Sequence, residues 1–320
     1  MTTRIIGTGS SLPDTVVTND YLSTIMDTTD EWISSRTGIK ERRLVKEETT
    51  GSMSIKAAKQ AMIDADITAA ELDLIIVGTV SGDYITPSTA CEVQSALGAT
   101  HAMAFDVNAA CTGFMVALHT AHAFLQTTHY TTALIIGAET LSKIIDWKDR
   151  STCVLFGDGA GAAVVRKDKT GLLAYTQGAD GTKGMALACK NRENNNPLVQ
   201  HPLTLGYTSM NGQEVYKFAV TKVPECIQEV LTEAGLQAAD IKYFILHQAN
   251  IRIIQSVAKR LKVSEDKFPI CLDHCGNISA ASVPILLDQV NRQGLLQSGD
   301  KIVLAGFGGG LTWGATVVEW

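Results

Sequence analysis

Short apolar segments alternate along this chain with longer segments in which apolar residues recur every three to four positions. The apolar segments have the length of buried strands, and they predict strands at residues 4–7, 74–80, 102–107, 133–137, 162–165, 243–246, 301–306 and 315–319. The amphipathic segments predict helices at residues 54–65, 112–126, 215–234, 251–261 and 280–293. Apolar strands between amphipathic helices are typical of a layered α/β fold.

An internal repeat relates the two halves of the chain at an offset of 169 residues. Residues 65–77 (ADITAAELDLIIV) resemble residues 234–246 (AGLQAADIKYFIL). The same offset pairs Asn108 with Asn277, each shortly before a predicted helix. Several such matches in one order indicate a duplication. No low-complexity linker divides the chain, so we expect two similar α/β halves, residues 1–170 and 171–320, that share an interface.

Cys111 stands where a predicted strand ends and a predicted helix begins, in the segment VNAACTGF of residues 107–114. Backbone N–H groups and the helix dipole at a helix N-terminus stabilise a thiolate. The small neighbours Ala109, Ala110 and Gly113 permit a tight turn and the close approach of a ligand. We therefore expect Cys111 to be a nucleophile and the other six cysteines to be structural.

Two polar residues in the second half are further candidates. His247 directly follows an apolar strand, at the kind of strand end where ligands bind in α/β sheets. A core histidine with satisfied hydrogen bonds is the alternative. Asn277 occupies the repeat position of Asn108, so Cys111 and Asn277 are expected at pseudo-symmetric elbows that face one central site. An ordinary turn or N-cap residue is the alternative for Asn277.

Glycine-rich and metal-like segments are less specific. The glycines at 308–310 follow a strand and could present backbone N–H groups to an oxyanion, or form a plain turn. The segment FGDGAG at 156–161 lacks the Walker lysine and the full dinucleotide spacing, so we interpret it as structural. Cys271, His274 and Cys275 lie close together without a second ligand pair at zinc-site spacing, and no metal is expected.

Composition and charge exclude several classes of protein. Hydrophobic residues make up 45% of the 320 residues, which excludes a disordered or fibrous chain. The formal net charge of −6 argues against a general nucleic-acid binder. The odd count of seven cysteines argues against a disulfide framework and favours a reducing, cytoplasmic setting. We expect a soluble protein, because no apolar run reaches the roughly 18 residues of a membrane span and no signal peptide is evident.

Eight short segments spread along the chain belong together: TDEWI at 29–33, RTGI at 36–39, AACTGF at 109–114, FGDGAG at 156–161, MNG at 210–212, HQAN at 247–250, GNIS at 276–279 and FGGG at 307–310. With them the whole chain resembles the 3-oxoacyl-[acyl-carrier-protein] synthase III family of the thiolase-like superfamily. The resemblance implies a thiolase-like fold of two duplicated α/β halves, layered α-β-α-β-α. It also implies the initiating condensing enzyme of type II fatty-acid synthesis, which converts acyl-coenzyme A and malonyl-acyl carrier protein to 3-oxoacyl-acyl carrier protein, coenzyme A and carbon dioxide.

The resemblance implies a catalytic triad of Cys111, His247 and Asn277. The Cys111 thiolate would attack the acyl-coenzyme A thioester, and His247 and Asn277 would stabilise the enolate that forms when malonyl-acyl carrier protein loses carbon dioxide. The backbone N–H groups of Cys111 and Gly309 would form an oxyanion hole. Neither a metal nor another cofactor is implied, since the coenzyme A thioester is a substrate. Elongating relatives use Cys–His–His and thiolases need a second active-site cysteine, so Asn277 and the lack of any cysteine after Cys275 argue against both.

The resemblance also assigns binding residues. Coenzyme A would be bound by Thr28, Trp32, Arg36, Arg150, Met210, Gly212, Ala249, Asn250 and Phe307. The acyl carrier protein would dock on Gln248, Ala249, Asn250, Ile251, Arg252, Lys217, Lys259 and Arg260, with Lys262 extending this surface. Seven residues separate Arg252 from Lys259, so both lie on one helix face, for which a plain solvated face is the alternative.

A homodimer is implied as well, with its interface at the apolar edge around the strand that follows Ala102. The segment YITP at 84–87 sits where relatives often carry a bulky aromatic residue that closes the acyl pocket from the partner subunit. If Thr86 takes that position, the pocket is roomier, and we expect tolerance of branched or longer starters. Two alternative functions remain open. One is a related condensing or acyl-transfer enzyme of secondary metabolism, and the other is a silent acyl-binding paralogue, against which the intact triad argues.

Overall fold

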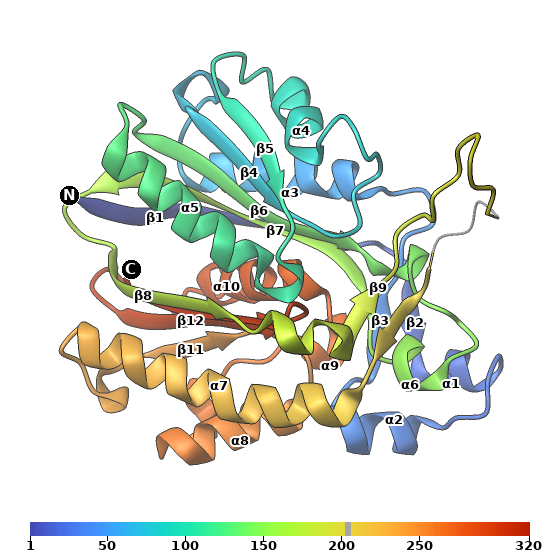
Figure 1. Ribbon diagram of the computed structural model, residues 1–320. Helices are drawn as coiled ribbons and strands as arrows, with labels where there is room; N and C mark the ends of the chain where they lie inside the picture. The colour runs from blue at the N-terminus through green and yellow to red at the C-terminus, as the bar shows by residue number, and fades with distance from the viewer. Residues whose placement is uncertain (202–205) are drawn as a thin grey trace.

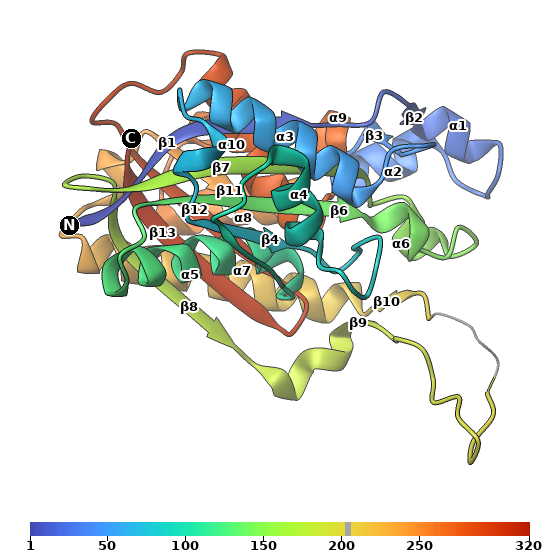
Figure 2. The same cartoon turned by 90° about the horizontal axis from the view of Figure 1, so that it is seen from above.

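Two β-sheets lie face to face with helices between them and on both outer faces (Figure 1). The computed structural model describes residues 1–201 and 206–320. The helices α3 (Thr50–Asp64) and α4 (Thr89–Leu97) cover the first sheet from outside, as the view from above in Figure 2 also shows. The helices α5 (Gly113–Thr127) and α10 (Ser282–Arg292) lie between the sheets, and α7 (Gly212–Glu233) and α8 (Ile251–Leu261) cover the second sheet. The order of layers is α-β-α-β-α, as expected.

The first sheet is built from the first half of the chain and the second sheet from the second half. The five strands of the first sheet follow the order β1 (Thr2–Ser11), β7 (Asp158–Asp168), β6 (Thr132–Thr140), β4 (Leu74–Gly78) and β5 (Met103–Val107). The four strands of the second sheet follow the order β11 (Tyr243–Leu246), β12 (Lys301–Gly308), β13 (Thr312–Glu319) and β8 (Leu172–Ala179). β4 runs parallel to β5 and β6, and β11 runs parallel to β12, whereas the other neighbours are antiparallel.

Shorter elements gather at one end of the molecule (Figure 1). They are the strand pairs β2 (Val16–Thr18) with β3 (Glu41–Arg43) and β9 (Leu187–Cys189) with β10 (Thr208–Met210), and the helices α1 (Asn19–Ser23), α2 (Asp30–Thr37), α6 (Arg150–Cys153) and α9 (Leu272–Cys275). In the described part of the chain, no helix is both long and apolar enough to cross a membrane.

The offset of 169 residues recurs in the backbone itself. α5 begins at Gly113 and α10 at Ser282, and the central strands β6 and β12 begin at residues 132 and 301. The residues Ala110 and Ser279 precede the two helices with φ of 44° and 45°, in the left-handed region that non-glycine residues rarely adopt. These coincidences support our proposal that residues 1–170 and 171–320 are copies of one α/β unit.

The apolar pattern accounts for the elements that were predicted and for the absence of β8 from the prediction. Every predicted strand and helix is present, since each carries a continuous apolar run or stripe, as in β4, whose five residues are all buried. Helix α3 begins earlier than predicted, because a capping box of Thr49 and Ser52 extends it to Thr50. The strand β8 was missed, because it lies at a sheet edge and alternates buried with exposed positions through polar residues.

Candidate active site

Cys111 lies in a short 3₁₀ turn, Ala110–Thr112, between the end of β5 and the start of α5. The second elbow, Ser279–Ala281, lies against this turn from the other half of the chain. The contact is close, because a Cβ placed on Gly113 would lie 3.0 Å from the Cβ of Ala280. Cys111 is only 6% exposed. The two elbows therefore hold the thiol between the two halves, as the repeat predicted.

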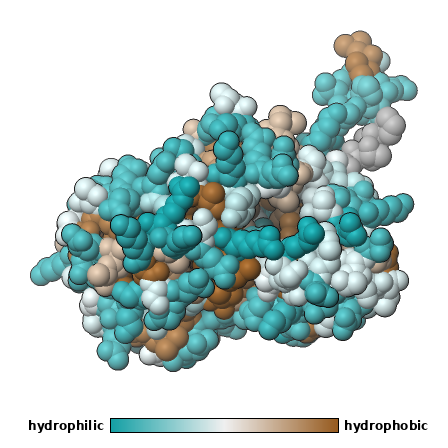
Figure 3. All heavy atoms as spheres, turned by 90° about the horizontal axis from the view of Figure 1, so that it is seen from below, coloured by the Kyte–Doolittle hydropathy of each residue, from teal (hydrophilic) through white to brown (hydrophobic). Residues whose placement is uncertain are grey.

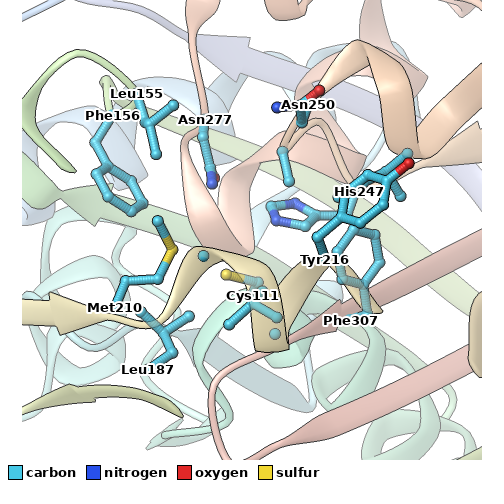
Figure 4. Close-up of a pocket in the computed structure, with 15 residues that line it drawn as sticks. Cys111, Leu155, Phe156, Leu187, Met210, Tyr216, His247, Asn250, Asn277 and Phe307 are labelled. Carbon is cyan, nitrogen blue, oxygen red and sulfur yellow. The ribbon is translucent and has the colours of Figure 1, made fainter. Parts of the chain in front are cut away.

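A cavity of about 230 Å³ reaches the Cys111 thiol (Figure 4). His247 and Asn277 also line it, and the figure shows their side chains directed toward Cys111. The structure thus brings the three candidate catalytic residues to one place from elements far apart in the sequence. The rest of the cavity wall includes residues that were expected at a ligand site: Met210, Gly212, Ala249, Asn250, Phe307 and Gly308, the last from the glycine-rich segment. It also includes residues that were not expected there: Leu155, Phe156, Leu187, Val215, Tyr216 and Ile253.

His247 is held rigidly at the end of β11. Its backbone N–H donates to the carbonyl of Ala305 at 2.8 Å, and its ring meets the ring of Phe307 edge to face, with centroids 5.1 Å apart. Burial lowers the pKa of His247 to about 3, so the imidazole is neutral near pH 7. Its Nδ1 has no hydrogen-bond partner among the described residues. A neutral imidazole carries one N–H that can donate to a developing oxyanion.

Asn277 presents its amide nitrogen to the cavity, because its other polar atoms are engaged. The Asn277 Oδ1 accepts from the backbone N–H of Ser279 at 2.9 Å. The Asn277 backbone N–H donates to Leu155 at 2.9 Å, and its carbonyl accepts from Gly157 at 3.0 Å. The NH₂ group then points toward Cys111 and His247 (Figure 4). His247 and Asn277 therefore offer two N–H donors to a group bound beside the thiol.

Cys111 is expected from its place at a helix start to be a thiolate at rest, but its surroundings in the structure favour the protonated thiol. Burial raises the pKa of the Cys111 thiol to about 11, and the nearby Glu139 carboxyl also raises it. The Ser279 side chain and the backbone N–H groups of Gly309 and Cys111 act in the opposite direction, without reversing the shift. The resting group is a thiol, because loss of water outweighs the helix dipole. These two backbone N–H groups are the ones expected to form the oxyanion hole, which stays a prediction.

Comparison with known proteins places this site in a family. The sequence pattern of 3-oxoacyl-[acyl-carrier-protein] synthase III matches residues 105–181, and the pattern of its C-terminal part matches residues 231–320. The chain is 52% identical to beta-ketoacyl-[acyl-carrier-protein] synthase III of Clostridium acetobutylicum, over 99% of this chain and 98% of that protein. The chain belongs to the 3-oxoacyl-[acyl-carrier-protein] synthase III family.

Solved structures agree with this family. The synthase III of Aquifex aeolicus VF5 superimposes with a TM-score of 0.92 at 45% identity, covering 99% of this chain and all of that one. A priming beta-ketosynthase from the R1128 polyketide biosynthetic pathway superimposes with a TM-score of 0.94 at 35% identity, covering 99% of this chain and 96% of that one. The thiolase-like layering expected of a synthase III is therefore present.

Four residues expected at the coenzyme A site of a synthase III lie outside the cavity. Trp32 on α2 is flanked by two guanidinium groups, with the Arg36 and Arg150 carbons 4.8 and 4.7 Å from its ring centroid. Thr28 is buried close by in the chain, and its hydroxyl has no partner among the described residues. Asn250 connects this group to the cavity, because its Nδ2 donates to the carbonyl of Arg36 at 3.1 Å.

The basic residues expected to dock a carrier protein fall on exposed positions of α7 and α8. They are Lys217, Arg252, Lys259 and Arg260, with Lys262 just beyond the end of α8. Ile251 and Ala249 are half-buried. Hydrophilic side chains predominate on this face of the molecule (Figure 3). The exposed face of α8 that carries Arg252 and Lys259 is therefore present. That a carrier protein docks on it is a proposal.

The expectation that Gln248 belongs to the docking surface is wrong. Its side chain is fully buried, with its Nε2 donating to Leu246 at 2.9 Å and its Oε1 accepting from the N–H groups of Cys271 and Leu272 at 3.1 and 3.2 Å. It ties the turn after His247 to helix α9 and presents no atom to a carrier protein. The sequence of a turn between a strand and a helix does not show whether a polar residue in it is exposed or buried.

The structure places Thr86 outside the cavity of its own chain and Phe156 in the cavity wall, and the sequence motifs indicate neither placement. Thr86 is exposed in the segment between β4 and α4, and it does not line the cavity of its own chain. Phe156, interpreted as part of a structural turn, lines the cavity because Phe156 and Asn277 form a β-bridge. Leu187, from the short strand β9, also lines the cavity. Its place there follows from tertiary packing, which no local sequence motif predicts.

Gly308 is expected to be indispensable for the position of the nucleophile. A Cβ at this position would lie 2.6 Å from the Cβ and 2.8 Å from the Sγ of Cys111, so Gly308→Ala must displace the thiol. A displacement near 1 Å costs about 10²-fold in rate, and we expect a loss of this size in acyl transfer. Gly181→Ala is the matched control, because nothing lies within 4 Å of a Cβ there. Equal acyl-transfer rates in the two variants would contradict this packing argument.

Proposed function

We propose that this protein starts fatty-acid synthesis by condensing an acyl-coenzyme A with malonyl-acyl carrier protein. The products are 3-oxoacyl-acyl carrier protein, coenzyme A and carbon dioxide. The observation that carries the proposal is the convergence of Cys111, His247 and Asn277 on one cavity, in a chain with the synthase III relatives described above. Incubation with both substrates tests it, and the 3-oxoacyl product is the expected result.

The first half-reaction transfers the acyl group to Cys111. The sulfur attacks the thioester carbon, and the oxygen of the tetrahedral intermediate accepts from the backbone N–H groups of Cys111 and Gly309. One such donor is typically worth about 3 kcal/mol of transition-state stabilisation. The intermediate collapses with departure of the coenzyme A sulfur, which takes up the proton that the Cys111 thiol has lost. The buried position of Cys111 keeps water from the acyl-enzyme.

The second half-reaction forms the carbon–carbon bond. Malonyl-acyl carrier protein loses carbon dioxide, and the resulting enolate oxygen accepts from His247 and Asn277. Both are neutral donors here, since burial holds the pKa of His247 near 3. The enolate carbon attacks the acyl group, and Cys111 leaves as a thiolate that is reprotonated. Decarboxylation makes this step favourable, so these steps need no metal or redox cofactor.

The entrance suits the two ends of coenzyme A. The Trp32 ring and the guanidinium groups of Arg36 and Arg150 close to it supply an aromatic surface and two positive charges, which suit an adenine and its phosphates. The cavity wall of Met210, Phe307 and other apolar side chains fits the pantetheine arm. Thr28, Gly212, Ala249 and Asn250 complete this proposed path.

The exposed basic face of α8 supports docking of an acidic carrier protein. Arg252 lies in the chain between the cavity-lining residues Asn250 and Ile253, and its guanidinium donates to the carbonyl of Ser35 at 2.8 Å. Lys259 and Arg260 continue the positive charge toward the C-terminal end of the helix. Complementary charge would steer the carrier protein so that its pantetheine arm meets the cavity.

A second copy of this chain is proposed to pair along β5. This strand is an edge of the first sheet, and Met103 on it is 46% exposed. Tyr84 and Ile85, in the segment between β4 and α4, are also exposed apolar residues. An apolar, unpaired edge is a natural interface. The seven free cysteines support a reducing compartment, and we propose the cytoplasm.

Thr86 is expected to widen the range of accepted starters, if it closes the partner's acyl pocket in such a dimer. A threonine leaves more space than the bulky aromatic residue that relatives often carry there. Isobutyryl-coenzyme A should therefore be condensed faster than acetyl-coenzyme A when the two compete. Thr86→Phe should restore the preference for acetyl-coenzyme A. Equal or slower use of isobutyryl-coenzyme A by the unchanged protein would refute this expectation.

A condensing role in secondary metabolism is the second candidate. The observation that favours it is the similarity to the R1128 priming beta-ketosynthase. An acyl-enzyme that only an acceptor other than malonyl-acyl carrier protein discharges would support this role. Absence of any adduct, with malonyl-acyl carrier protein unconsumed, would support an acyl-binding paralogue instead.

A further inference from the structure

A pair of threonine hydroxyls joins the turn that carries the nucleophile to the glycine loop of residues 308–312. The hydroxyl oxygens of Thr112 and Thr312 lie 2.9 Å apart. Thr112 Oγ1 also lies 2.7 Å from the carbonyl oxygen of Ala109, and Thr312 Oγ1 lies 2.9 Å from the carbonyl oxygen of Gly309. Among the described residues, this pair makes the only side-chain hydrogen bond between the turn and the glycine loop. No step described above uses it.

The two hydroxyls have two protons for three contacts, so the direction of their hydrogen bonds is constrained. A threonine hydroxyl donates one hydrogen bond and can accept others. The Ala109 carbonyl already accepts from the backbone N–H of Thr112 at 3.0 Å, whereas the carbonyl of the buried Gly309 has no second partner among the described residues. Both carbonyls are satisfied only if Thr112 donates to Thr312 and Thr312 donates to Gly309. The two hydroxyls therefore form one chain that ends on the glycine loop.

The glycine loop lies directly against the nucleophile, so its position matters for the chemistry. A Cβ at Gly308 would lie 2.8 Å from Cys111 Sγ, and a Cβ at Gly309 would lie 3.2 Å from the Cβ of Ala110. Thr112 is buried, and neither threonine lines the cavity. The hydroxyl pair can therefore hold the loop against the turn without touching a substrate in the cavity.

We propose that the hydroxyl pair of Thr112 and Thr312 fixes the spacing of the two backbone N–H groups in the proposed oxyanion hole. The N–H of Cys111 belongs to the turn, and the N–H of Gly309 belongs to the loop. An oxyanion hole works because its donors are already in place when charge develops on the oxygen. Both threonines are positioning residues, since they touch neither the substrate nor the reacting atoms. The inference rests on the proposed acylation of Cys111.

Replacement of each threonine by valine and by serine tests the pair. Valine keeps the branched shape and removes the hydroxyl, whereas serine keeps the hydroxyl. Acylation of Cys111 is timed by rapid-quench mass spectrometry at several concentrations of acetyl-coenzyme A. Thr112→Val and Thr312→Val should lower the maximal acylation rate about 10²-fold, as a displacement near 1 Å does, and leave the KM unchanged. Thr112→Ser and Thr312→Ser should recover most of the rate.

Three further readouts separate positioning from general damage. Decarboxylation of malonyl-acyl carrier protein without acyl-coenzyme A depends on His247 and Asn277, so it should keep its rate. Isotope-edited infrared spectroscopy of a labelled acyl group on Cys111 reports the hydrogen bonds to its carbonyl oxygen. The carbonyl band should move to higher frequency in both valine variants, because hydrogen bonds lower this frequency. The double valine variant should be no slower than the slower single variant, since the two hydroxyls act as one chain.

Thr316→Val is the matched control. Thr316 lies on β13, the strand that begins at Thr312, and it is fully buried. Its hydroxyl forms a hydrogen bond with Nε2 of His119, and it does not line the cavity. This variant also loses a buried hydrogen bond and should lose stability. It should keep both the acylation rate and the carbonyl band of the unchanged protein.

Several results would overturn the proposal. They are an unchanged acylation rate in Thr312→Val, an equal fall of acylation and decarboxylation, and a serine variant as slow as its valine counterpart. Effects that multiply in the double variant would also overturn it, because the hydroxyls would then act separately. Thr312→Val decides alone where circular dichroism shows that Thr112→Val is unfolded. Failure of the unchanged protein to become acylated refutes the proposed function instead.

Discussion

Cys111→Ala is expected to abolish both acyl transfer and condensation, by at least about 10⁴-fold. Cys111 carries the only thiol among the residues that line the described cavity, and the proposed acyl-thioester intermediate cannot form without it. His247 and Asn277 remain in place, so slow decarboxylation of malonyl-acyl carrier protein should persist. Intact-protein mass spectrometry after addition of acyl-coenzyme A measures the first effect, and carbon dioxide release measures the second.

Cys275→Ala is the control for this prediction. Hydrogen bonding with Cys271 and with His274 lowers the pKa of the Cys275 thiol, so Cys275 ionises more easily than Cys111. It does not line the cavity and should stay unacylated. We expect the full adduct in Cys275→Ala and none in Cys111→Ala. An adduct that survives in Cys111→Ala would show that the nucleophile is another residue.

His247→Ala is expected to slow condensation about 10²- to 10³-fold while Cys111 is still acylated. The reason is the loss of one of two N–H donors to the enolate oxygen. Asn277→Ala should have an effect of similar size, and the double variant should lose less than the product of the two, because both act on one oxygen. Separate measurement of acylation and of 3-oxoacyl product formation distinguishes the steps.

The pH dependence gives an independent check on the role of His247. Its pKa lies near 3, so it stays neutral from pH 5 to 9 and should contribute no titration to condensation in that range. Condensation at the unchanged rate in His247→Ala would show that the enolate is stabilised elsewhere. A limb near pH 6.5 that disappears in this variant would show that His247 works as a titrating base.

The repeat explains why so much of the fold and the triad could be predicted. Pairing Asn108 with Asn277 predicts two pseudo-symmetric elbows that face one central site. The structure then brings Cys111 and Asn277 to one cavity. Buried strands such as β4 are predicted well, because a continuous apolar run is sufficient to identify them.

The remaining features depend on tertiary burial, which local sequence does not encode. Gln248 looks like a surface residue in the segment HQAN, yet its amide satisfies the buried start of α9. The raised pKa of Cys111 follows from loss of water, which the helix-start pattern alone does not reveal. Ser279 stands 169 residues after Ala110 and shares its left-handed backbone conformation, a detail that the repeat in the sequence does not by itself reveal.

The most direct test of the account is a single-turnover experiment that follows Cys111 through both substrates. The protein is loaded with acyl-coenzyme A, freed of excess reagent and then mixed with malonyl-acyl carrier protein, while peptide mass spectrometry monitors the segment with Cys111. We predict one acyl group on Cys111, followed by its loss and the appearance of an equal amount of 3-oxoacyl-acyl carrier protein. An acyl group that remains on Cys111 in the presence of malonyl-acyl carrier protein, or a product that forms without any acylated Cys111, would contradict the account.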